Sequence, residues 1–105
     1  MIMNGVIALS DPTRRRIIEM LAQGEMAAGE IVARFALSAP AISQHLRALR
    51  EARLVRVRIA AQRRIYALDP AGFAELQRWL ARVAPRREVG PGAGESPLVS
   101  GVLPP

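Results

Sequence analysis

The apolar residues of this chain change their spacing once, and that change limits the folds open to it. Up to Arg53 they recur every three or four residues, the spacing of one face of a helix. Between Val55 and Tyr66 they alternate with other residues, which is typical of an antiparallel β-hairpin, here with its tip at residues 60–62. The pattern therefore predicts a mainly α-helical fold with one small β-hairpin.

Capping and helix-breaking residues mark several helices. Asp11 and Asp69 each precede a proline. The Asp side-chain oxygen can cap the free N–H groups of the first turn, and proline fits there because its missing N–H would have no partner within the helix. Gly24 and Pro85 end the two helices that begin there. Upstream, residues 2–7 form a short apolar stripe at helical spacing, which predicts a first helix.

Two further helices are predicted in the middle of the chain. One covers about residues 27–35, and Ser38 can cap the next, which runs to residue 52. Only residues 36 and 37 separate them, so the two helices must cross sharply. Four helices, a hairpin and a closing helix are the elements of a winged helix-turn-helix, in that order.

Positive charge is concentrated in the middle third of the sequence. The chain has 15 basic residues, all of them Arg, against 9 acidic ones, and a net charge of +6. Residues 34–66 carry eight of the Arg and one acid, whereas the segments on either side are almost neutral. Such a patch favours polyanionic partners, either nucleic acid or an anionic membrane surface. No apolar run approaches the roughly 18 residues of a membrane span, so we expect a cytoplasmic protein with no membrane partner.

The composition also divides the 105 residues into a domain and a tail. Residues 85–105 contain five Pro and four Gly without apolar periodicity, which predicts a disordered tail. Residues 1–84 then form the folded domain. A domain of that size buries little surface by itself, so we expect it to associate with another copy.

The helix from Ser38 is the predicted DNA-reading element. Its apolar residues take one face, which leaves Ser43 and Gln44 facing outward, and Gln can pair bidentately with adenine. Four Arg of the hairpin are expected along the DNA backbone or in the minor groove. The alternatives are a solvated polar helix face and a hairpin kept soluble by charge. The full predicted DNA-binding set is Ser38, Ala39, Pro40, Ser43, Gln44, His45, Arg47, Arg56, Arg58, Gln62, Arg63 and Arg64.

The two end helices carry an apolar stripe wider than a single exposed helix needs. One interpretation is ordinary core packing, and the other, which we prefer, is the contact between two subunits of a homodimer. The predicted dimer residues are Ile2, Met3, Val6, Ile7, Phe73, Leu76, Trp79, Leu80 and Val83.

The sequence contains few of the residues that catalysis or metal binding requires. The chain has no Cys and one His, His45, whose nearest following acid, Glu51, lies off its helix face. No Gly-rich phosphate loop occurs. We therefore predict no enzyme, no cofactor and no metal site, and expect His45 to be structural or to face a phosphate.

Five short runs form a series along the chain: residues 11–15 (DPTRR), 38–46 (SAPAISQHL), 54–55 (LV), 64–66 (RIY) and 68–70 (LDP). In this order they resemble the ArsR family of prokaryotic winged-helix repressors, over about residues 8–80. The resemblance implies a homodimer, formed through the first and last helices, that binds an imperfect palindrome in a promoter and blocks transcription, often of its own gene.

The chain departs from the family at the metal sites. Relatives that sense metals use Cys in the helix before the turn, where this chain has Ile-Val-Ala at residues 31–33, or Asp and His in the last helix, which here has no His. The resemblance therefore implies the metal-independent subgroup. Ala39 stands where relatives often have Gln, and Arg53 and Ala61 where they usually have Gly, which would strain both turns wherever a positive φ is required.

Two other functions stay open. The same fold would bind a partner protein through its apolar end helices if DNA binding were weak or lost, and Ala39, Arg53 and the short last helix keep that alternative open. Non-specific RNA binding is disfavoured, because one Trp, one Tyr and two Phe are too few to stack unpaired bases.

Overall fold

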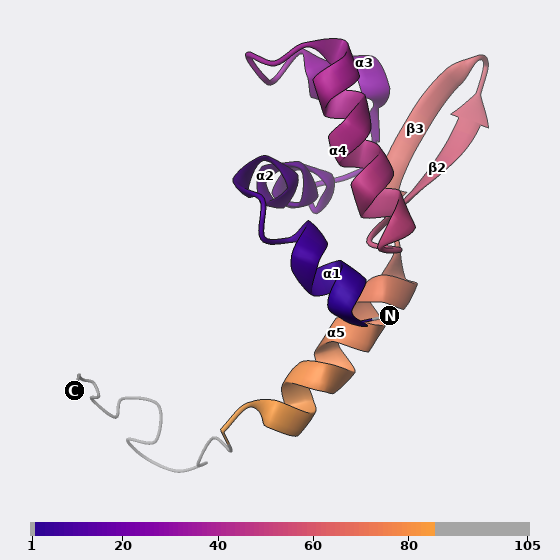
Figure 1. Cartoon of the computed structure of the whole chain (residues 1–105). Coiled ribbons are helices and arrows are strands. Elements are labelled where there is room, and N and C mark those ends of the chain that lie inside the picture. The colour runs from indigo at the N-terminus through magenta and orange to yellow at the C-terminus, as the bar shows by residue number, and fades with distance from the viewer. Residues whose placement is uncertain (1, 86–105) are drawn as a thin grey trace, which may run out of the picture.

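The structure is a computed structural model, and it describes residues 2–85. Five helices and a three-stranded antiparallel sheet build it. The hairpin projects at one end and the last helix extends from the other, with the first helix beside it (Figure 1). The elements are α1 (Ile2–Ala8), α2 (Pro12–Leu21), β1 (Met26–Ala27), α3 (Ala28–Val32), α4 (Ala39–Glu51), β2 (Val55–Ala60), β3 (Arg63–Leu68) and α5 (Pro70–Val83). Apart from Pro85, the predicted tail lies outside the described residues.

Side-chain caps begin three of the helices where the sequence predicts them. Asp11 accepts two backbone N–H groups of α2, at 2.8 and 3.1 Å. Ser38 accepts one from the first turn of α4 at 3.2 Å, and Asp69 one from α5 at 3.0 Å. Each cap satisfies donors that have no partner within the helix, and its loss would cost about 1 kcal/mol.

Helix α3 is shorter than predicted. The expectation that it runs to Phe35 is wrong, because it ends at Val32 and the chain then tightens: the Phe35 N–H bonds the Val32 carbonyl, three residues back, at 3.2 Å. At the other end Ala27 has no oxygen for a cap. Glu30 compensates by accepting the Ala27 N–H at 2.8 Å.

The sheet has one strand more than the predicted hairpin. Strand β1 pairs with β3, so the order is β1-β3-β2. Met26 lies opposite Tyr66, and Val57 lies opposite Tyr66 on its other side. The predicted hairpin is confirmed, but its tip is Ala61 and Gln62 and not residues 60–62, because Ala60 is the last residue of β2 and pairs with Arg63. A strand of two residues is too short to show alternation, so no pattern predicted it.

The register places the hairpin arginines on two faces. Residues directly opposite in an antiparallel pair share a face, and Ile59 pairs with Arg64. Arg64 therefore lies on the same face as buried Tyr66, two residues further along β3. Arg56 and Arg58 lie on the other face.

The core lies between α2, α3, α4 and the base of the hairpin. Its fully buried large side chains are Ile17, Ile31, Ile42, Leu49 and Leu54. Phe73 and Leu76 of α5 are partly buried against this core. Helix α4 is thus held by apolar contacts along its inner face.

Gly72 joins α5 to the corner between α4 and β2. Its N–H donates to the Arg53 carbonyl at 3.1 Å. A Cβ at this position would overlap that carbonyl oxygen and lie 2.7 Å from its carbon, so only glycine allows the approach.

Arg53, Ala61 and Gln62 have left-handed backbones, with φ of 63°, 50° and 71°. Positive φ is therefore required at both positions where the chain lacks the glycine of its relatives. Two successive left-handed residues at the tip are typical of a type I′ turn.

Within residues 2–85, no helix is long and apolar enough to cross a bilayer.

Candidate nucleic-acid interface

Helix α4 presents the face that the sequence predicts. Ile42, Leu46 and Leu49 are buried, while Ser43 and Gln44 are exposed. Thirteen residues give a helix of about 20 Å. Its end fits a B-DNA major groove, which is about 12 Å wide. Ala39 and Pro40, in the first turn, are exposed and offer only apolar contact, and the Ser38 hydroxyl caps the helix.

Arg47 also lies on the outer face. Its Nε donates to the Glu51 carboxylate at 3.1 Å, one helical turn away, and the two side chains are 78% and 66% exposed. An exposed pair of this kind contributes about 0.3 to 0.5 kcal/mol. Arg47 can therefore exchange Glu51 for a DNA phosphate at little cost.

A groove separates α4 from the hairpin. Its volume is about 490 Å³, and its lining comprises Ser43, Arg47, Arg50, Glu51, Arg64 and Tyr66. Three guanidinium groups from two elements converge there, which suits a polyanion. Arg50 is not among the predicted DNA-binding residues, although it lies seven residues after Ser43 and so on the same helix face.

The remaining hairpin residues divide into two groups. Gln62 and Arg63 are exposed at and beside the tip. Arg58 donates to Glu25 at 2.7 and 3.2 Å, on the face of the hairpin away from Arg64, and Arg56 lies on that face too. The structure therefore brings Arg64, but not Arg56 or Arg58, to the groove beside α4.

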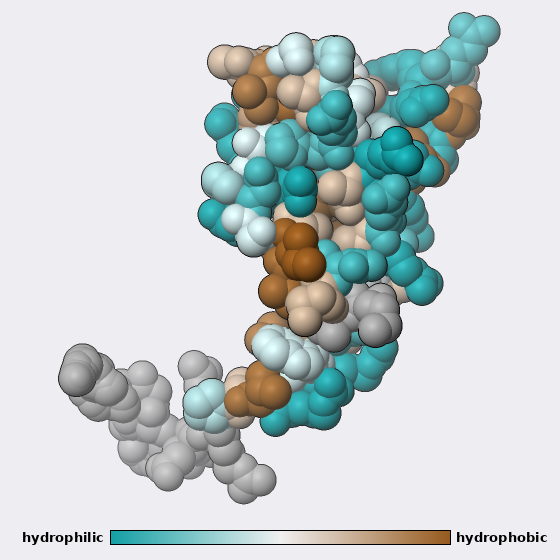
Figure 2. Space-filling model, in the orientation of Figure 1, coloured by the Kyte–Doolittle hydropathy of each residue, from teal (hydrophilic) through white to brown (hydrophobic). Residues whose placement is uncertain are grey.

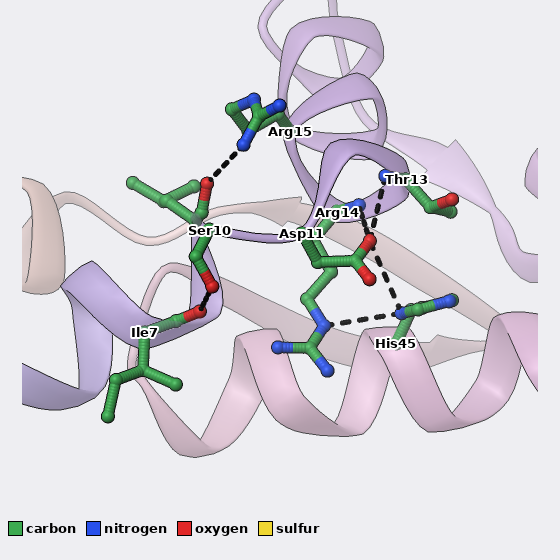
Figure 3. A network of polar contacts seen from close by, with 8 residues as sticks. Ile7, Ser10, Asp11, Thr13, Arg14, Arg15 and His45 are labelled. Atoms are coloured by element: carbon green, nitrogen blue, oxygen red, sulfur yellow. Dashed lines mark hydrogen bonds and ion pairs between the residues drawn. The ribbon is translucent and has the colours of Figure 1, made fainter.

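His45 takes part in a polar contact between α2 and α4. The Arg14 Nε donates to His45 Nδ1 at 3.2 Å, and the Asp11 carboxylate lies 4.0 Å from the same nitrogen (Figure 3). Burial favours a higher pKa for Asp11, but the backbone hydrogen bonds from Arg14 and Thr13 and the positive charge of Arg14 outweigh it, so that the pKa is lowered.

Apolar side chains are exposed on α1 and at the end of α5. Met3, Val6, Ile7, Leu80 and Val83, here called the apolar end patch, are between 42% and 59% exposed. Figure 2 shows hydrophobic surface at both of these places. Of the other predicted dimer residues, Phe73 and Leu76 pack on the core, Trp79 is half-buried, and the Ile2 side chain is not described.

The arrangement offers no obvious metal centre. Among residues 2–85, no group of three or more His, Cys, Asp or Glu side chains comes together. The chemistry on this surface is that of arginines, a hydroxyl and an amide, which bind phosphates and base edges.

Known proteins are similar to this chain in sequence and in fold. The family profile described as "Bacterial regulatory protein, arsR family" matches residues 11–57. HTH-type transcriptional regulator Rv2034 of Mycobacterium tuberculosis is 49% identical over 83 residues, which cover 79% of this chain and 78% of that protein. Transcriptional repressor SdpR of Bacillus subtilis is 38% identical over 79 residues, covering 74% and 88%.

Solved structures agree. The crystal structure of a possible transcriptional regulator for arsenical resistance superposes with a TM-score of 0.68 at 40% identity, covering 75% of this chain and 82% of that one. The predicted winged helix-turn-helix fold is thereby confirmed, as is the prediction that the chain is not an enzyme. The chain belongs to the ArsR family of DNA-binding transcriptional regulators.

Proposed function

We propose that this protein is a homodimeric repressor that binds an imperfect palindrome in a promoter, without sensing metal through Cys or His sites. The observation that carries the proposal is the exposed pair Ser43 and Gln44 on α4, beside the arginine-lined groove. The two side chains read base edges, and Arg47, Arg50 and Arg64 bind the phosphates next to them. Such a regulator acts in the cytoplasm, on the chromosome.

The apolar end patch supports the dimer. Five exposed apolar side chains on two adjacent helices would be covered if two subunits met through α1 and α5. Two reading helices related by a twofold axis then fit half-sites about 34 to 36 Å apart. This is also how a domain of this size gains stability.

Metal independence is supported by the donors that the chain possesses. Transition-metal sites in proteins rely on thiolate and imidazole ligands, and this chain has no Cys and a single His, which already accepts a hydrogen bond from Arg14. DNA binding should therefore be unchanged by EDTA and by added Zn²⁺. Release of DNA by either treatment would contradict this part of the proposal.

A gel-shift titration tests the reading face. The probes are a duplex from upstream of the protein's own gene and a scrambled duplex of equal length. Replacing Ser43 and Gln44 together by Ala should remove the preference for the upstream duplex, whereas replacing Arg63 and Arg64 should weaken binding to both duplexes. Affinity that does not change between low and moderate salt would contradict a phosphate-based interface.

The molar mass in solution tests the dimer. Light scattering should give twice the chain mass of 11.4 kDa. A monomer that binds neither duplex would instead favour the alternative, in which the apolar end patch binds a different protein.

A further inference from the structure

The contact between Arg14 and His45 is a long-range polar contact on another side of α4 from the groove just described. It joins residues 31 positions apart, at the start of α2 and in the middle of α4. Asp11 holds the start of α2 in place, because its carboxylate accepts the Thr13 and Arg14 N–H groups (Figure 3). The backbone at Arg14 is thus held by the cap, and its side chain reaches His45 on α4.

This contact determines which nitrogen of His45 carries the proton. A neutral imidazole has one donor and one acceptor nitrogen, and Nδ1 accepts from the Arg14 Nε. The proton therefore resides on Nε2, which points away from Arg14 (Figure 3). No residue within 2–85 accepts a hydrogen bond from Nε2 or from the two terminal nitrogens of Arg14. The pair therefore offers the charge of Arg14 and several N–H donors to an anion, beside the Asp11 carboxylate, which lies 4.0 Å from His45 Nδ1.

The pair also flanks the reading helix on the side away from the hairpin. At about 100° per residue, His45 lies about 160° around the α4 axis from Ser43. Ser43 lines the groove that contains Arg64, whereas His45 contacts α2. A helix in the major groove has a phosphate backbone on each side, and the hairpin can contact only one of the two.

We infer that Arg14 and His45 form a clamp for a DNA backbone phosphate, on the strand opposite to the one that the hairpin contacts. The Arg14 guanidinium supplies charge and terminal N–H donors, and His45 donates from Nε2. Asp11 is a positioning residue. The clamp rests on the proposed binding mode, in which α4 enters the major groove, and it adds a second fixed point that sets the angle of α4.

The salt dependence of binding tests the clamp. Each phosphate contact contributes about 0.9 to the slope of log K against log salt concentration, so Arg14→Gln should lower the slope by about 1.8 in a dimer. The upstream and scrambled duplexes should lose affinity by the same factor, because a phosphate carries no sequence information. Arg15→Gln is the matched control: it removes the same charge one residue along, where the side chain donates to the exposed Leu9 carbonyl.

The outcomes separate the clamp from the wider proposal. If the wild-type protein shifts the upstream duplex but Arg14→Gln and Arg15→Gln have equal slopes, the clamp is wrong and the binding mode stands. If the wild-type protein shifts neither duplex, both are wrong. Thermal melting of each variant shows whether the fold is retained, and the slope is compared only between folded proteins.

A spectroscopic test does not depend on any variant. His45 is the only histidine of the chain, so the imidazole ¹⁵N signals report on it alone. In alkaline buffer, where an imidazole is neutral, the proton should be found on Nε2, and its signal should move when the upstream duplex is added. A proton on Nδ1, or a ring signal unmoved by bound DNA, would overturn the assignment.

Discussion

Arg53 occupies a backbone position that suits glycine, and replacing it by Gly should stabilise the protein. It follows the C-cap of α4 with φ of 63°, its N–H bonds the Arg50 carbonyl at 2.9 Å, and the next N–H, of Leu54, bonds the Leu49 carbonyl at 3.0 Å. These two bonds define a Schellman motif, in which the left-handed residue is usually Gly.

The size of the effect follows from two opposing terms. A left-handed backbone costs a non-glycine residue roughly 1 to 2 kcal/mol. Glycine removes that cost but loses about 0.5 to 1 kcal/mol of conformational entropy on folding. The expected gain is therefore about 0.5 to 1 kcal/mol, which corresponds to a rise in Tm of about 2 to 8 °C for a domain of this length.

Arg50→Gly is the matched control for Arg53→Gly. Both side chains are exposed and both variants lose one Arg, but residue 50 lies inside α4, where Gly should destabilise by about 1 kcal/mol. Melting curves of the three proteins at equal concentration, by circular dichroism, give the comparison. If Arg53→Gly melts at a lower temperature than the wild type, the left-handed backbone of Arg53 does not destabilise the protein.

Three other changes have defined outcomes. Gly72→Ala should destabilise by about 1 to 3 kcal/mol, since the new methyl group forces α5 away from the Arg53 carbonyl, and urea unfolding with an unchanged midpoint would contradict the close approach. Leu80→Glu should convert the proposed dimer into a monomer, as measured by light scattering. The melting curve should stay cooperative, because Leu80 is 51% exposed and outside the core. If the variant keeps the mass of a dimer, α5 is not part of the interface. The wild type should be more stable than Asp11→Asn at neutral pH. Because the folded pKa of Asp11 is lowered, that advantage holds above the ordinary value of 3.8 and is lost as pH falls through the folded pKa, and urea titrations with an equal difference at all pH values would refute it.

Local signals explain what the sequence could predict. Asp11, Ser38 and Asp69 cap helices because each acts on N–H groups two or three residues away, and the hairpin shows its alternation over six residues per strand. Features that depend on distant pairing were missed or left open. The two-residue strand β1 exists through its pairing with β3 and has no periodicity of its own. The end of α3 was missed for a local reason, because Phe35 extends the apolar spacing of the helix beyond the point where its hydrogen bonds tighten.

The residues of the candidate site also differ in whether a local pattern predicts them. Ser43 and Gln44 were predictable because helical spacing alone decides which side of α4 is exposed. The separation of Arg64 from Arg56 and Arg58 depends on strand register, which a two-residue tip determines but composition does not. The contact between Arg14 and His45 spans 31 positions, and no local pattern could have indicated it.

Strand β1 makes the hairpin mechanically continuous with the helix-turn-helix. Ala27 pairs with Ile65 in the sheet, and α3 begins at the very next residue. Because α3 also contacts β3, and α4 contacts β2, a displacement of α3 would reach the hairpin through the two backbone pairs of β1 and through these contacts together. The orientation of the hairpin relative to α4 therefore depends on α3 as well as on the short segment that joins α4 to β2.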